Sequence, residues 1–442
     1  MPEQLITPGG NPNAPGTFSF KREGATAGFS VTTEGVMLLG DGVTTPTING
    51  VALGNLSIVN VKNYGAKGDG VTDDTTSIAA AIAAVGAGGI VFFPAGSYIT
   101  SSALTLTSYI KLVGEGGQRS RITNSTSNMF TSGSSAVYQI TFDGMYLVAG
   151  AAAGHIFAPG TGGIASSVFR DSTFTQNNTG KSIYLNNTSA GNNTFINNLW
   201  IGCNFQGSLS HTVPLFYLSS TGGFCNQNMF ISCQVITSGN YPFYFEELAA
   251  SNYTYDNVFI GILFEQCNGG GIKGVSANSW RIADCHHYDQ GTITADLFVF
   301  DKSASGPASR FITFERVNRR GGTIGAFNDI KLATNNATLV DIVQCGTASG
   351  NLIVDLGTCS FVKFRNTLAT VTNPNTAHVA SGVTTADTNI TNVVSHFAGS
   401  GSPLNVVVAP IGSTYQRADG GAGTSFYVKE SGNGASTGWV AK

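Results

Sequence analysis

The stretch that decides the fold is residues 61–116, VKNYGAKGDGVTDDTTSIAAAIAAVGAGGIVFFPAGSYITSSALTLTSYIKLVGEG. It opens with glycines at positions 65, 68 and 70, which suit a tight loop because glycine takes positive φ at little cost. The Asp-Asp-Thr of residues 73–75 then offers N-cap oxygens to a helix. Ile78, Ile82 and Val85 recur at helical spacing, and the glycines of residues 86–89 end the helix.

Short strands are predicted directly after this helix. Residues 90–93, IVFF, are an apolar run that Pro94 and Gly96 interrupt and that Tyr98 and Ile99 resume. One short amphipathic helix therefore leads into a series of short strands. We expect the helix to cap an elongated stack of strands, whose first hydrophobic layer would otherwise meet water.

This arrangement resembles a known family. The pattern YGAKGDGVTDDT, the alanine-rich helix and GGIVFFPAGSY are similar to the start of the pectate-lyase-like right-handed parallel β-helices, in particular the tailspikes and depolymerases of bacteriophage tails. The resemblance covers the quoted stretch. It implies the fold much more than the reaction, because the family includes hydrolases, lyases and proteins with no known chemistry.

Composition agrees with an all-β solenoid and excludes several classes of protein. The 442 residues include 57 glycines and only 11% charged residues, as expected for many short strands joined by polar turns. A net charge of −3 gives no reason to expect a nucleic-acid partner. No segment approaches the ~20 apolar residues of a membrane span, and the first ten residues lack the features of a signal peptide.

Seven cysteines, an odd number without a CxxC pair, argue against a disulfide framework or a zinc site. We expect no cofactor and no metal. Asp69, Asp73 and Asp74 could bind calcium as a cluster, but capping of the helix and ordering of the glycine loop explain them better. The resemblance implies a virion protein of the phage tail that is made in the host cytoplasm, where thiols stay reduced.

Three segments are expected. Residues 1–57 contain proline-rich and short strand-like pieces, and by resemblance they attach the spike to a phage tail or baseplate protein. Residues 58–365 form the β-helix. Residues 366–442 lose the coil period and should form a small C-terminal β domain that trimerises or caps the helix, with strands at 414–415 and 425–429, a turn at 419–423 and Trp439 as an anchor. Phe426, Tyr427, Val428 and Trp439 suggest burial between copies, and the resemblance implies a parallel homotrimer.

The middle segment repeats at intervals of roughly 30 residues, the signature of a solenoid. Two columns can be aligned. The first is IYLNN from Ile183, FYLSS from Phe216, FYFEE from Phe243, GIKGV from Gly271, FVFDK from Phe298 and IKLAT from Ile330. The second is VFRDSTF from Val168, LWIGCNF from Leu199, MFISCQV from Met229, VFIGILF from Val258 and RIADCHH from Arg281. In the second column Cys203, Cys233 and Cys285 are interpreted as small buried stacking residues rather than reactive thiols.

Acids are scarce in the repeats, so each one is informative. Glycoside hydrolysis needs two carboxyl groups. The candidates are Glu246, Glu247, Asp256, Glu265, Asp284, Asp289, Asp301 and Glu315. The first column places Glu246 and Asp301 at the same position two coils apart, which at ~4.8 Å per strand separates their Cα atoms by roughly 10 Å. That spacing suits an inverting pair.

A second cluster joins Glu265 to the run Asp284–Asp289, which contains His286, His287 and Tyr288. The predicted catalytic residues are Glu246, Asp301, Glu265, Asp284 and Asp289. The predicted substrate-binding residues are Tyr244, Trp280, His286 and Tyr288, with Tyr241, Tyr253 and Tyr255 as further aromatic residues that could stack on sugar rings.

The expected function is that of a phage tailspike that binds a bacterial surface polysaccharide, capsule or O-antigen, and cleaves it by hydrolysis. A polygalacturonase is disfavoured, because no Gly-His-Gly occurs and the one Asp-Asp lies in the cap. A polysaccharide lyase stays open because Lys273 and Arg281 lie close to the acids in sequence. A non-catalytic receptor-binding or structural tail protein with the same fold is the third alternative.

Overall fold

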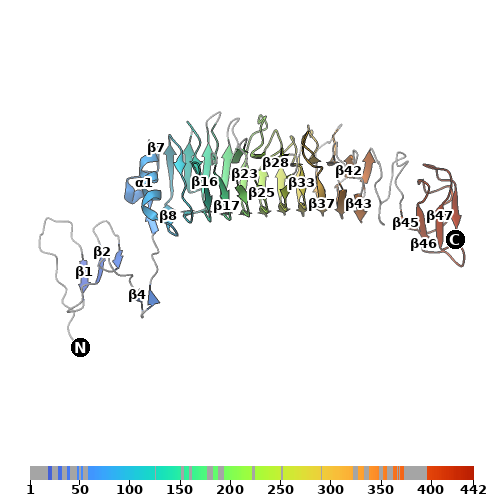
Figure 1. The fold of residues 1–442 in the computed structure, drawn as a ribbon, viewed down its shortest axis with the longest axis horizontal. Helices are drawn as coiled ribbons and strands as arrows, with labels where there is room; N and C mark the ends of the chain where they lie inside the picture. Colours follow the sequence, from blue (N-terminus) through green and yellow to red (C-terminus); the bar gives the residue numbers. More distant parts are fainter. Residues whose placement is uncertain are drawn as a thin grey trace.

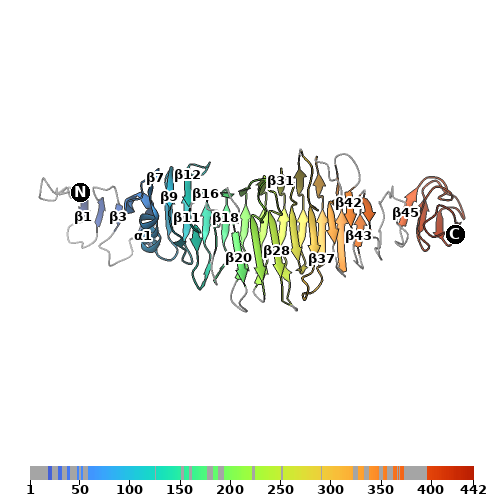
Figure 2. The ribbon, with the colours of Figure 1, turned by 90° about the horizontal axis from the view of Figure 1, so that it is seen from above.

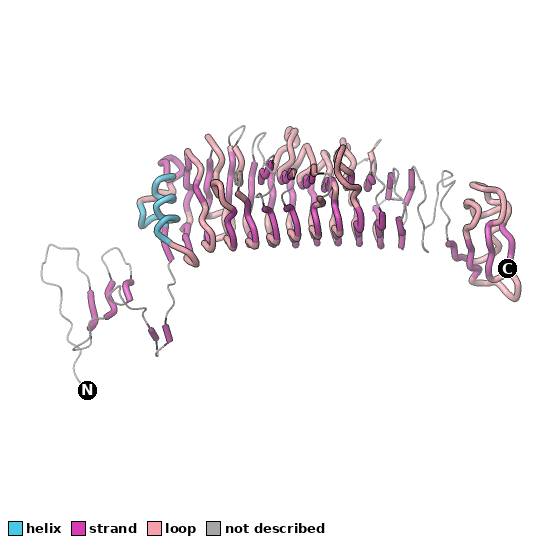
Figure 3. Tube along the Cα trace, viewed as in Figure 1, coloured by secondary structure: helices cyan, strands magenta, loops and turns pink. Residues whose placement is uncertain are grey.

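The computed structural model describes most of the chain from residue 58 onward and five short strands before it. The described residues are 18–21, 28–31, 37–39, 47–48, 51–52 and 58–442, except 125, 151–153, 159–161, 177–182, 188–193, 222–223, 250–251, 290, 322–326, 333–337, 348–351, 356–361, 366, 368 and 373–395. Within them the architecture is a parallel β-helix with one α-helix and a small C-terminal sheet (Figures 1 and 3). No helix in this part of the chain is long and apolar enough to cross a membrane.

The predicted capping helix is present at one end of the stack (Figure 3). A 3₁₀ turn, η1 (Val61–Tyr64), and strand β7 (Asp69–Asp73) precede α1 (Thr75–Val85). The helix contacts β6, β8 and β10, and it buries the predicted residues Ile78, Ile82 and Val85. It therefore covers the first apolar layer, as the sequence indicated.

The acidic residues before α1 do not all cap the helix in the way expected from the sequence. The Asp73 carboxylate accepts hydrogen bonds from the backbone N–H of Thr75 at 3.0 Å and from its hydroxyl. Asp74 holds the N-cap position, yet its side chain makes no cap hydrogen bond and instead accepts from the N–H of Lys67 and Gly68. Asp69 orders the loop through Thr72, as predicted. Asp74 therefore ties the glycine loop to the start of the helix.

The coils form three long parallel sheets (Figure 2). The first sheet contains, in spatial order, β6 (Ile58–Asn60), β8 (Ile90–Phe93), β11 (Lys111–Gly114), β15 (Thr141–Asp143), β18 (Val168–Arg170), β22 (Leu199–Ile201), β26 (Met229–Ile231), β30 (Val258–Ile260), β34 (Arg281–Ala283), β37 (Arg310–Glu315), β40 (Thr338–Val343) and β43 (Val362–Arg365); β33 (Ala277–Asn278) also pairs with β37, and β29 (Thr254–Tyr255) pairs with β33.

The second sheet contains β7, β9 (Gly96–Thr100), β12 (Ser120–Asn124), β16 (Tyr146–Ala149), β19 (Thr173–Gln176), β23 (Asn204–Gln206), β27 (Gln234–Ile236), β31 (Leu263–Glu265), β35 (His286–Tyr288), β38 (Asn318–Arg319) and β41 (Gly346–Thr347). The third contains β20 (Ile183–Asn187), β24 (Phe216–Ser220), β28 (Phe243–Glu247), β32 (Ile272–Val275), β36 (Phe298–Asp301), β39 (Ile330–Leu332), β42 (Leu352–Asp355) and β44 (Ala369–Thr372).

Smaller parallel groups complete the coils. Strands β14 (Ala136–Tyr138), β17 (Gly163–Ala165), β21 (Thr194–Ile196) and β25 (Phe224–Asn226) form one sheet, and β10 (Leu104–Thr105) pairs with β13 (Phe130–Thr131). The three long sheets together carry the chain from residue 58 to residue 372, one strand beyond the expected end of the β-helix at residue 365.

The observed register confirms most of the alignment. In the first sheet Val168, Leu199, Met229, Val258 and Arg281 pair in succession, as predicted for the second column. In the third sheet the predicted starts hold at Ile183, Phe216, Phe243, Phe298 and Ile330. One start is wrong: Ile272, not Gly271, pairs with Phe243. Glycine carries no side chain that could mark which way the strand faces.

A single residue in the left-handed region turns the corner between the first and second sheets of each coil. This position holds Asp171, Gly202, Ser232, Gly261, Asp284 and Arg316, with φ between 48° and 67°. At the opposite end of the first-sheet strands, buried asparagines form a ladder: Asn198 donates to Asn228 at 3.0 Å, and Asn228 donates to Asn257 at 2.9 Å. Each of these side chains also donates to a backbone carbonyl. The buried amides therefore give hydrogen-bond partners to backbone groups that would otherwise lack them at this corner.

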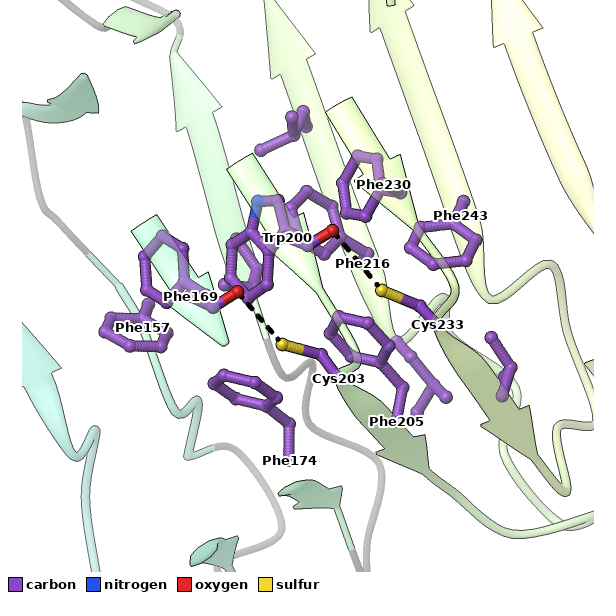
Figure 4. Close-up of a cluster of buried hydrophobic side chains, with 14 of the residues drawn as sticks. Phe157, Phe169, Phe174, Trp200, Cys203, Phe205, Phe216, Phe230, Cys233 and Phe243 are labelled. Atoms are coloured by element: carbon purple, nitrogen blue, oxygen red, sulfur yellow. Dashed lines mark hydrogen bonds between the residues drawn. The ribbon is translucent and has the colours of Figure 1, made fainter. Parts of the chain in front are cut away.

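The interior is a stack of aromatic rings (Figure 4). Phe169 lies 3.7 Å from Trp200 with parallel rings, and Phe230 stacks on Phe259 at 4.9 Å. Cys203 and Cys233 occupy equivalent corners, where each thiol faces a backbone carbonyl of the preceding coil (Figure 4). Burial raises the pKa of the Cys285 thiol, at the same position, to about 12. The interpretation of these cysteines as buried stacking residues is therefore confirmed.

Both ends of the chain carry antiparallel strands. Before the β-helix, β1 (Phe18–Lys21), β2 (Gly28–Val31) and β3 (Met37–Leu39) form one sheet, and β4 (Thr47–Ile48) pairs with β5 (Val51–Ala52). The other residues of the expected attachment segment 1–57 lie outside the described residues.

After the β-helix, β45 (His396–Gly399), β46 (Thr414–Arg417), β47 (Phe426–Lys429) and β48 (Trp439–Ala441) form the small C-terminal sheet, including both predicted strands. Trp439 and Tyr427 are buried within this sheet's own core, against Tyr415 and Ala409. Their burial therefore needs no second copy, which removes two of the four residues offered for burial between chains. Phe426 stays exposed.

Candidate functional site

A row of tyrosines covers the outward side of the third sheet. Alternation along β28 turns Phe243, Phe245 and Glu247 inward and leaves Tyr244 and Glu246 outward. Tyr184, Tyr217 and Tyr244 pair in register across three strands. Their rings follow one another at centroid distances of 6.0 and 5.3 Å, and the His155 ring lies 4.5 Å from Tyr184. The result is a continuous aromatic row across neighbouring coils.

Glu246 lies beneath this row. The Tyr217 hydroxyl donates to Oε1 of Glu246, and the Tyr244 hydroxyl donates to Oε2 at 2.6 Å. The side chain is buried although it points outward, because the two rings cover it. A charge-assisted hydrogen bond of this kind is about twice as strong as a neutral one. Glu246 therefore fixes two neighbouring rings of the row, and the rings in turn hold the carboxylate.

The tyrosines are held as hydrogen-bond donors. Burial, followed by the hydrogen bond to Glu246, raises the pKa of both Tyr217 and Tyr244 well above the ordinary range for a phenol. Both hydroxyl groups therefore keep their protons across the whole physiological pH range. The rings present their faces and edges along the row while the hydroxyls are committed to the carboxylate.

Asp301 lies in the same outward column as Glu246. Glu246 pairs with Val275, and Val275 pairs with Asp301, which places the two carboxyl groups two strands apart. At ~4.8 Å per strand their Cα atoms are roughly 10 Å apart, as the alignment predicted. Asp301 Oδ1 accepts the backbone N–H of Lys302 at 2.8 Å, and the side chain is half-buried.

A lysine continues the tyrosine row. Lys273 pairs with Tyr244 in register, and its Nζ lies 4.6 Å from the centre of the Tyr244 ring and 5.9 Å from that of Tyr241. We call this surface the tyrosine face and define it by Tyr184, Tyr217, Tyr244, Glu246, Lys273 and Asp301. It combines aromatic rings, two carboxyl groups and one cation over five successive strands.

Three other predicted residues gather on the second sheet instead. Glu265 pairs with Tyr288 across β31 and β35, and Leu263 pairs with His286 on the same outward side. The Glu265 carboxylate accepts a hydrogen bond from the Gln234 side chain at 2.9 Å. Tyr288 is 40% exposed, so its ring is available at the surface. Glu265, His286 and Tyr288 therefore form a separate surface from the tyrosine face.

Asp284 does not join either group. It occupies the left-handed corner between β34 and β35, and Arg316 holds it through two hydrogen bonds of 2.5 and 2.8 Å. These bonds lower the pKa of the Asp284 carboxyl below its usual value. The prediction that Asp284 acts together with Glu265 and Asp289 is therefore not supported by its position, since its carboxylate is engaged by an arginine on the side of the first sheet.

Two more predicted residues lie in the interior. Trp280 is 1% exposed, donates its indole N–H to the carbonyl of Thr254 at 2.7 Å and packs against Phe245 and Phe300, so the prediction that it stacks on a sugar is wrong. Asp289 is 5% exposed and accepts the N–H of Gly291. It points inward, like His287 two residues earlier, so it cannot reach a polysaccharide on the outer surface.

The basic residues that kept a lyase open are also separated. Lys273 is on the third sheet, whereas Arg281 is on the first sheet and donates to Glu315 at 2.7 Å. Arg281 therefore cannot act beside Lys273. Among the described residues, no three histidine, cysteine, aspartate or glutamate side chains are grouped so as to hold a metal ion.

Sequence reasoning missed part of the tyrosine face. Tyr184 and Tyr217 stand at the second position of IYLNN and FYLSS, directly equivalent to Tyr244 in FYFEE. This recurrence was visible in the first column. An aromatic residue repeated at an outward position of a solenoid is the signal that would have identified the row.

Comparisons with known proteins agree with the resemblance to the pectate-lyase-like proteins. Residues 58–273 match the family model of rhamnogalacturonase A/epimerase, pectate lyase-like proteins. The mannuronan C5-epimerase AlgE1 of Azotobacter vinelandii is 48% identical over 66 residues, which are 13% of this chain and 5% of that protein. The chain thus spans a small fraction of the length of the curated relatives that it matches.

Two solved structures share the fold. A tailspike protein mutant of E. coli bacteriophage HK620, in complex with a pentasaccharide, gives a TM-score of 0.55 at 13% identity and covers 86% of this chain and 75% of that one. The Streptococcus pneumoniae surface protein and adhesin PfbA gives 0.53 at 13% identity, covering 76% and 96%. At these identities the likeness concerns the fold alone. Residues 58–273, just under half of the chain, are therefore similar to the pectate-lyase-like family, and their parallel coils form the β-helix that this resemblance implies.

Proposed function

We propose that this protein is a phage tailspike that binds a bacterial surface polysaccharide along the tyrosine face and cleaves it by glycosidic hydrolysis. The observation that carries the proposal is Glu246, held by the hydroxyls of Tyr217 and Tyr244 and in register with Asp301 two strands away. A row of rings that crosses successive coils offers a sugar chain repeated stacking surfaces. The tailspike and adhesin folds and the match to a polysaccharide epimerase support this class of ligand.

For cleavage, Glu246 and Asp301 supply the two carboxyl groups. One donates a proton to the leaving oxygen, and the other activates a water molecule on the opposite side of the sugar ring. Their separation of roughly two strand spacings leaves room for that water, as in inverting glycosidases. Lys273 faces the same row and can pair with an acidic group on the polysaccharide.

In the proposed assembly, the N-terminal segment attaches the protein to the phage tail and three copies associate in parallel. The virion is then the place of action. Repeated sites in a trimer would increase avidity for a repeating polymer, since linked sites make the later binding events intramolecular.

Incubation of the pure protein with capsule or O-antigen polysaccharides tests the reaction. Hydrolysis yields new reducing ends without ultraviolet absorption, and this is the expected result. An unsaturated uronate that absorbs in the ultraviolet would show a lyase and overturn the hydrolytic assignment. A polysaccharide that is bound but left intact would show a binding protein.

The second candidate is therefore a non-catalytic receptor-binding protein. One observation favours it: both oxygens of Glu246 accept hydrogen bonds from tyrosines, so the carboxylate also serves to orient the rings. In that case Glu246→Gln should weaken binding rather than turnover. Measuring binding and product formation for the same variant separates the two functions.

A further inference from the structure

Two loops that leave the third sheet meet across a coil with almost no loop of its own. The chain uses residues 248–253 to pass from β28 to β29 and residues 302–309 to pass from β36 to β37. In the coil between them, Ser276 alone joins β32 to β33. The Ser305 hydroxyl donates to the carbonyl of Leu248 at 3.2 Å. The two loops are therefore in contact over this short coil.

Arg310, directly after the second loop, stacks on a ring at the end of the first. It follows the buried Ser309 and is directed outward by the alternation of β37. Its Cζ lies 4.5 Å from the centre of the Tyr253 ring and 5.6 Å from that of Phe311. The Tyr255 ring lies 5.4 Å from the Tyr253 ring. We call Tyr253, Tyr255, Arg310 and Phe311 the arginine–aromatic cluster.

The guanidinium of Arg310 has no carboxylate partner in the part of the chain that the structure describes. In the neighbouring coils Arg281, Arg316 and Arg319 each pair with a carboxylate. The Nε of Arg310 is enclosed without a hydrogen-bond acceptor, whereas neither Nη atom is enclosed in this way. An arginine fork matches a carboxylate or a phosphate with two parallel hydrogen bonds. Arg310 is thus a cation whose outer donors are available to a ligand.

Phe311 departs from the pattern of the corner that it occupies. The corner before each first-sheet strand is a single residue in the left-handed region. Tyr109 occupies the first such corner, and polar residues occupy the next six: Gln139, Ser166, Asn197, Gln227, Asp256 and Ser279. The following coil places Phe311 there, with φ 55° and 45% of its surface exposed. A bulky residue is unfavourable in this conformation and gains little burial in return, so its ring beside Arg310 indicates a contact outside the chain.

We propose that the arginine–aromatic cluster is a second binding site, whose ligand is a sugar that carries an oxyanion. The oxyanion is a carboxylate or a phosphate, since the two Nη groups of Arg310 can donate parallel hydrogen bonds to either. The Tyr253 ring supports the guanidinium, and the exposed Phe311 ring packs against the apolar side of the sugar. The site recognises charge, whereas the tyrosine face offers a row of rings on another side of the β-helix.

The test measures the binding of three small sugars to the full-length protein by ligand-observed nuclear magnetic resonance. Methyl glucuronoside carries a carboxylate, glucose 1-phosphate carries a phosphate, and methyl glucoside is the uncharged control. We expect one or both charged sugars to bind with a dissociation constant of about 10 mM or tighter, and methyl glucoside not to bind. The charged sugar that binds more tightly identifies the source of the oxyanion. Equal binding of all three sugars, or binding of neither charged sugar, would overturn the inference.

Variants of the cation test the role of Arg310. Arg310→Gln should weaken the binding of the charged sugar at least about 10-fold, because charged hydrogen bonds are lost. Arg310→Lys keeps the charge but not the fork and should recover only part of the affinity. The matched control is Lys302→Gln, which removes the same charge from an exposed position of the same loop and should keep the wild-type affinity. An equal loss in both glutamine variants would show attraction to net charge alone and overturn the site.

Phe311→Ser tests the aromatic part with a residue that the corner accommodates, since Ser166 and Ser279 occupy equivalent corners. The melting temperature should be unchanged or higher, while the affinity for the charged sugar should fall about 3–10-fold because the ring contact is lost. Unchanged affinity in both Phe311→Ser and Arg310→Gln would leave these residues with a structural role only and overturn the inference.

The choice of a sugar as the carrier of the oxyanion rests on the proposed function, but the two proposals fail separately. A wild-type protein that binds the charged sugar and leaves every polysaccharide uncleaved overturns the proposed hydrolysis and supports this site. A protein that cleaves a polysaccharide but binds neither charged sugar overturns this inference alone.

Discussion

The first and third sheets enclose the same interior, but the side chains on their outward faces differ in chemistry. Inside, both contribute aromatic rings to one stack, as Trp200 and Phe216 show at a ring distance of 5.4 Å. Outside, the first sheet shows aliphatic side chains and the third shows tyrosines with two carboxyl groups. The interior positions are constrained by stacking between coils, whereas the outward positions are free to specialise. Function in this molecule should therefore be sought in the outward columns, one sheet at a time.

The largest effect is expected at the two carboxyl groups of the tyrosine face. Glu246→Gln and Asp301→Asn should each lower the rate of polysaccharide cleavage by about 10²–10⁴-fold, because each removes an acid or base from the reaction. The measurement is the release of reducing ends. Glu265→Gln, on the second sheet, is the matched control and should keep the wild-type rate. Full activity in both tyrosine-face variants would contradict the assignment.

Substitutions at interior and outward positions should also differ in how much they lower the stability of the protein. Trp200→Ala removes a ring from the centre of the aromatic stack and should cost about 3–5 kcal/mol of unfolding free energy. Leu199→Ala, one residue earlier and directed outward, should cost much less in a dissociated chain. Urea denaturation of both variants under dissociating conditions measures the difference, and equal losses would refute the separation of interior and outward positions.

One interior position of the second sheet holds a histidine where the preceding coil has a phenylalanine. Where the preceding coil places Phe264, the next places His287, which is fully buried and donates one hydrogen bond to the carbonyl of Cys267. Burial lowers the pKa of His287 to about 4.

The unfolded chain therefore binds more protons between pH 6.5 and 4, and stability should fall as the pH falls through this window, by about 3 kcal/mol in total. His287→Gln should lose this part of the pH dependence when denaturation midpoints are compared at pH 7 and pH 4.5. An unchanged pH profile in the variant would show that other groups cause the acid sensitivity.

The smallest effect concerns the ordering of the rings. Tyr244→Phe keeps the aromatic face but removes the hydroxyl that donates to Glu246. The loss of one hydrogen bond should weaken polysaccharide binding by about 3–10-fold, or roughly 1 kcal/mol. Tyr288→Phe, on the second sheet, should have no effect. Calorimetric titration of both variants with the same polysaccharide makes the comparison, and the reverse outcome would move the site to the second sheet.

Much of the fold could be predicted from the sequence because most positions that define the helix and the coils carry a side chain whose type shows whether it faces inward or outward. The capping helix followed from Ile78, Ile82 and Val85, and the column from Val168 to Arg281 followed from repeated apolar residues and cysteines. The alignment failed by one residue at Gly271, where there is no side chain to show direction. Glu246 and Asp301 were nevertheless correctly aligned, because the coils on either side carry clear patterns.

The candidate site was less predictable because corners interrupt the alternation of side chains. Ser279 and Asp284 adopt left-handed conformations, and each resets which face the next residue takes. Trp280 follows such a corner and turns inward, which the sequence does not reveal. Closeness in sequence was equally misleading: Glu265, Asp284 and Asp289 come to lie on an outward face, a corner and the interior. Only pairing between strands shows which residues share a surface.

The most direct test of the tyrosine face as the polysaccharide site compares two double variants. An array of capsule and O-antigen polysaccharides first identifies a ligand of the wild type. Tyr217→Ala with Tyr244→Ala removes two rings of the third sheet, and Tyr146→Ala with Tyr288→Ala removes two rings of the second sheet. Equilibrium binding should weaken at least about 10-fold in the first variant, because stacking and ring order are lost together, and stay unchanged in the second. Unchanged binding in the first variant, with loss in the second, would contradict the account.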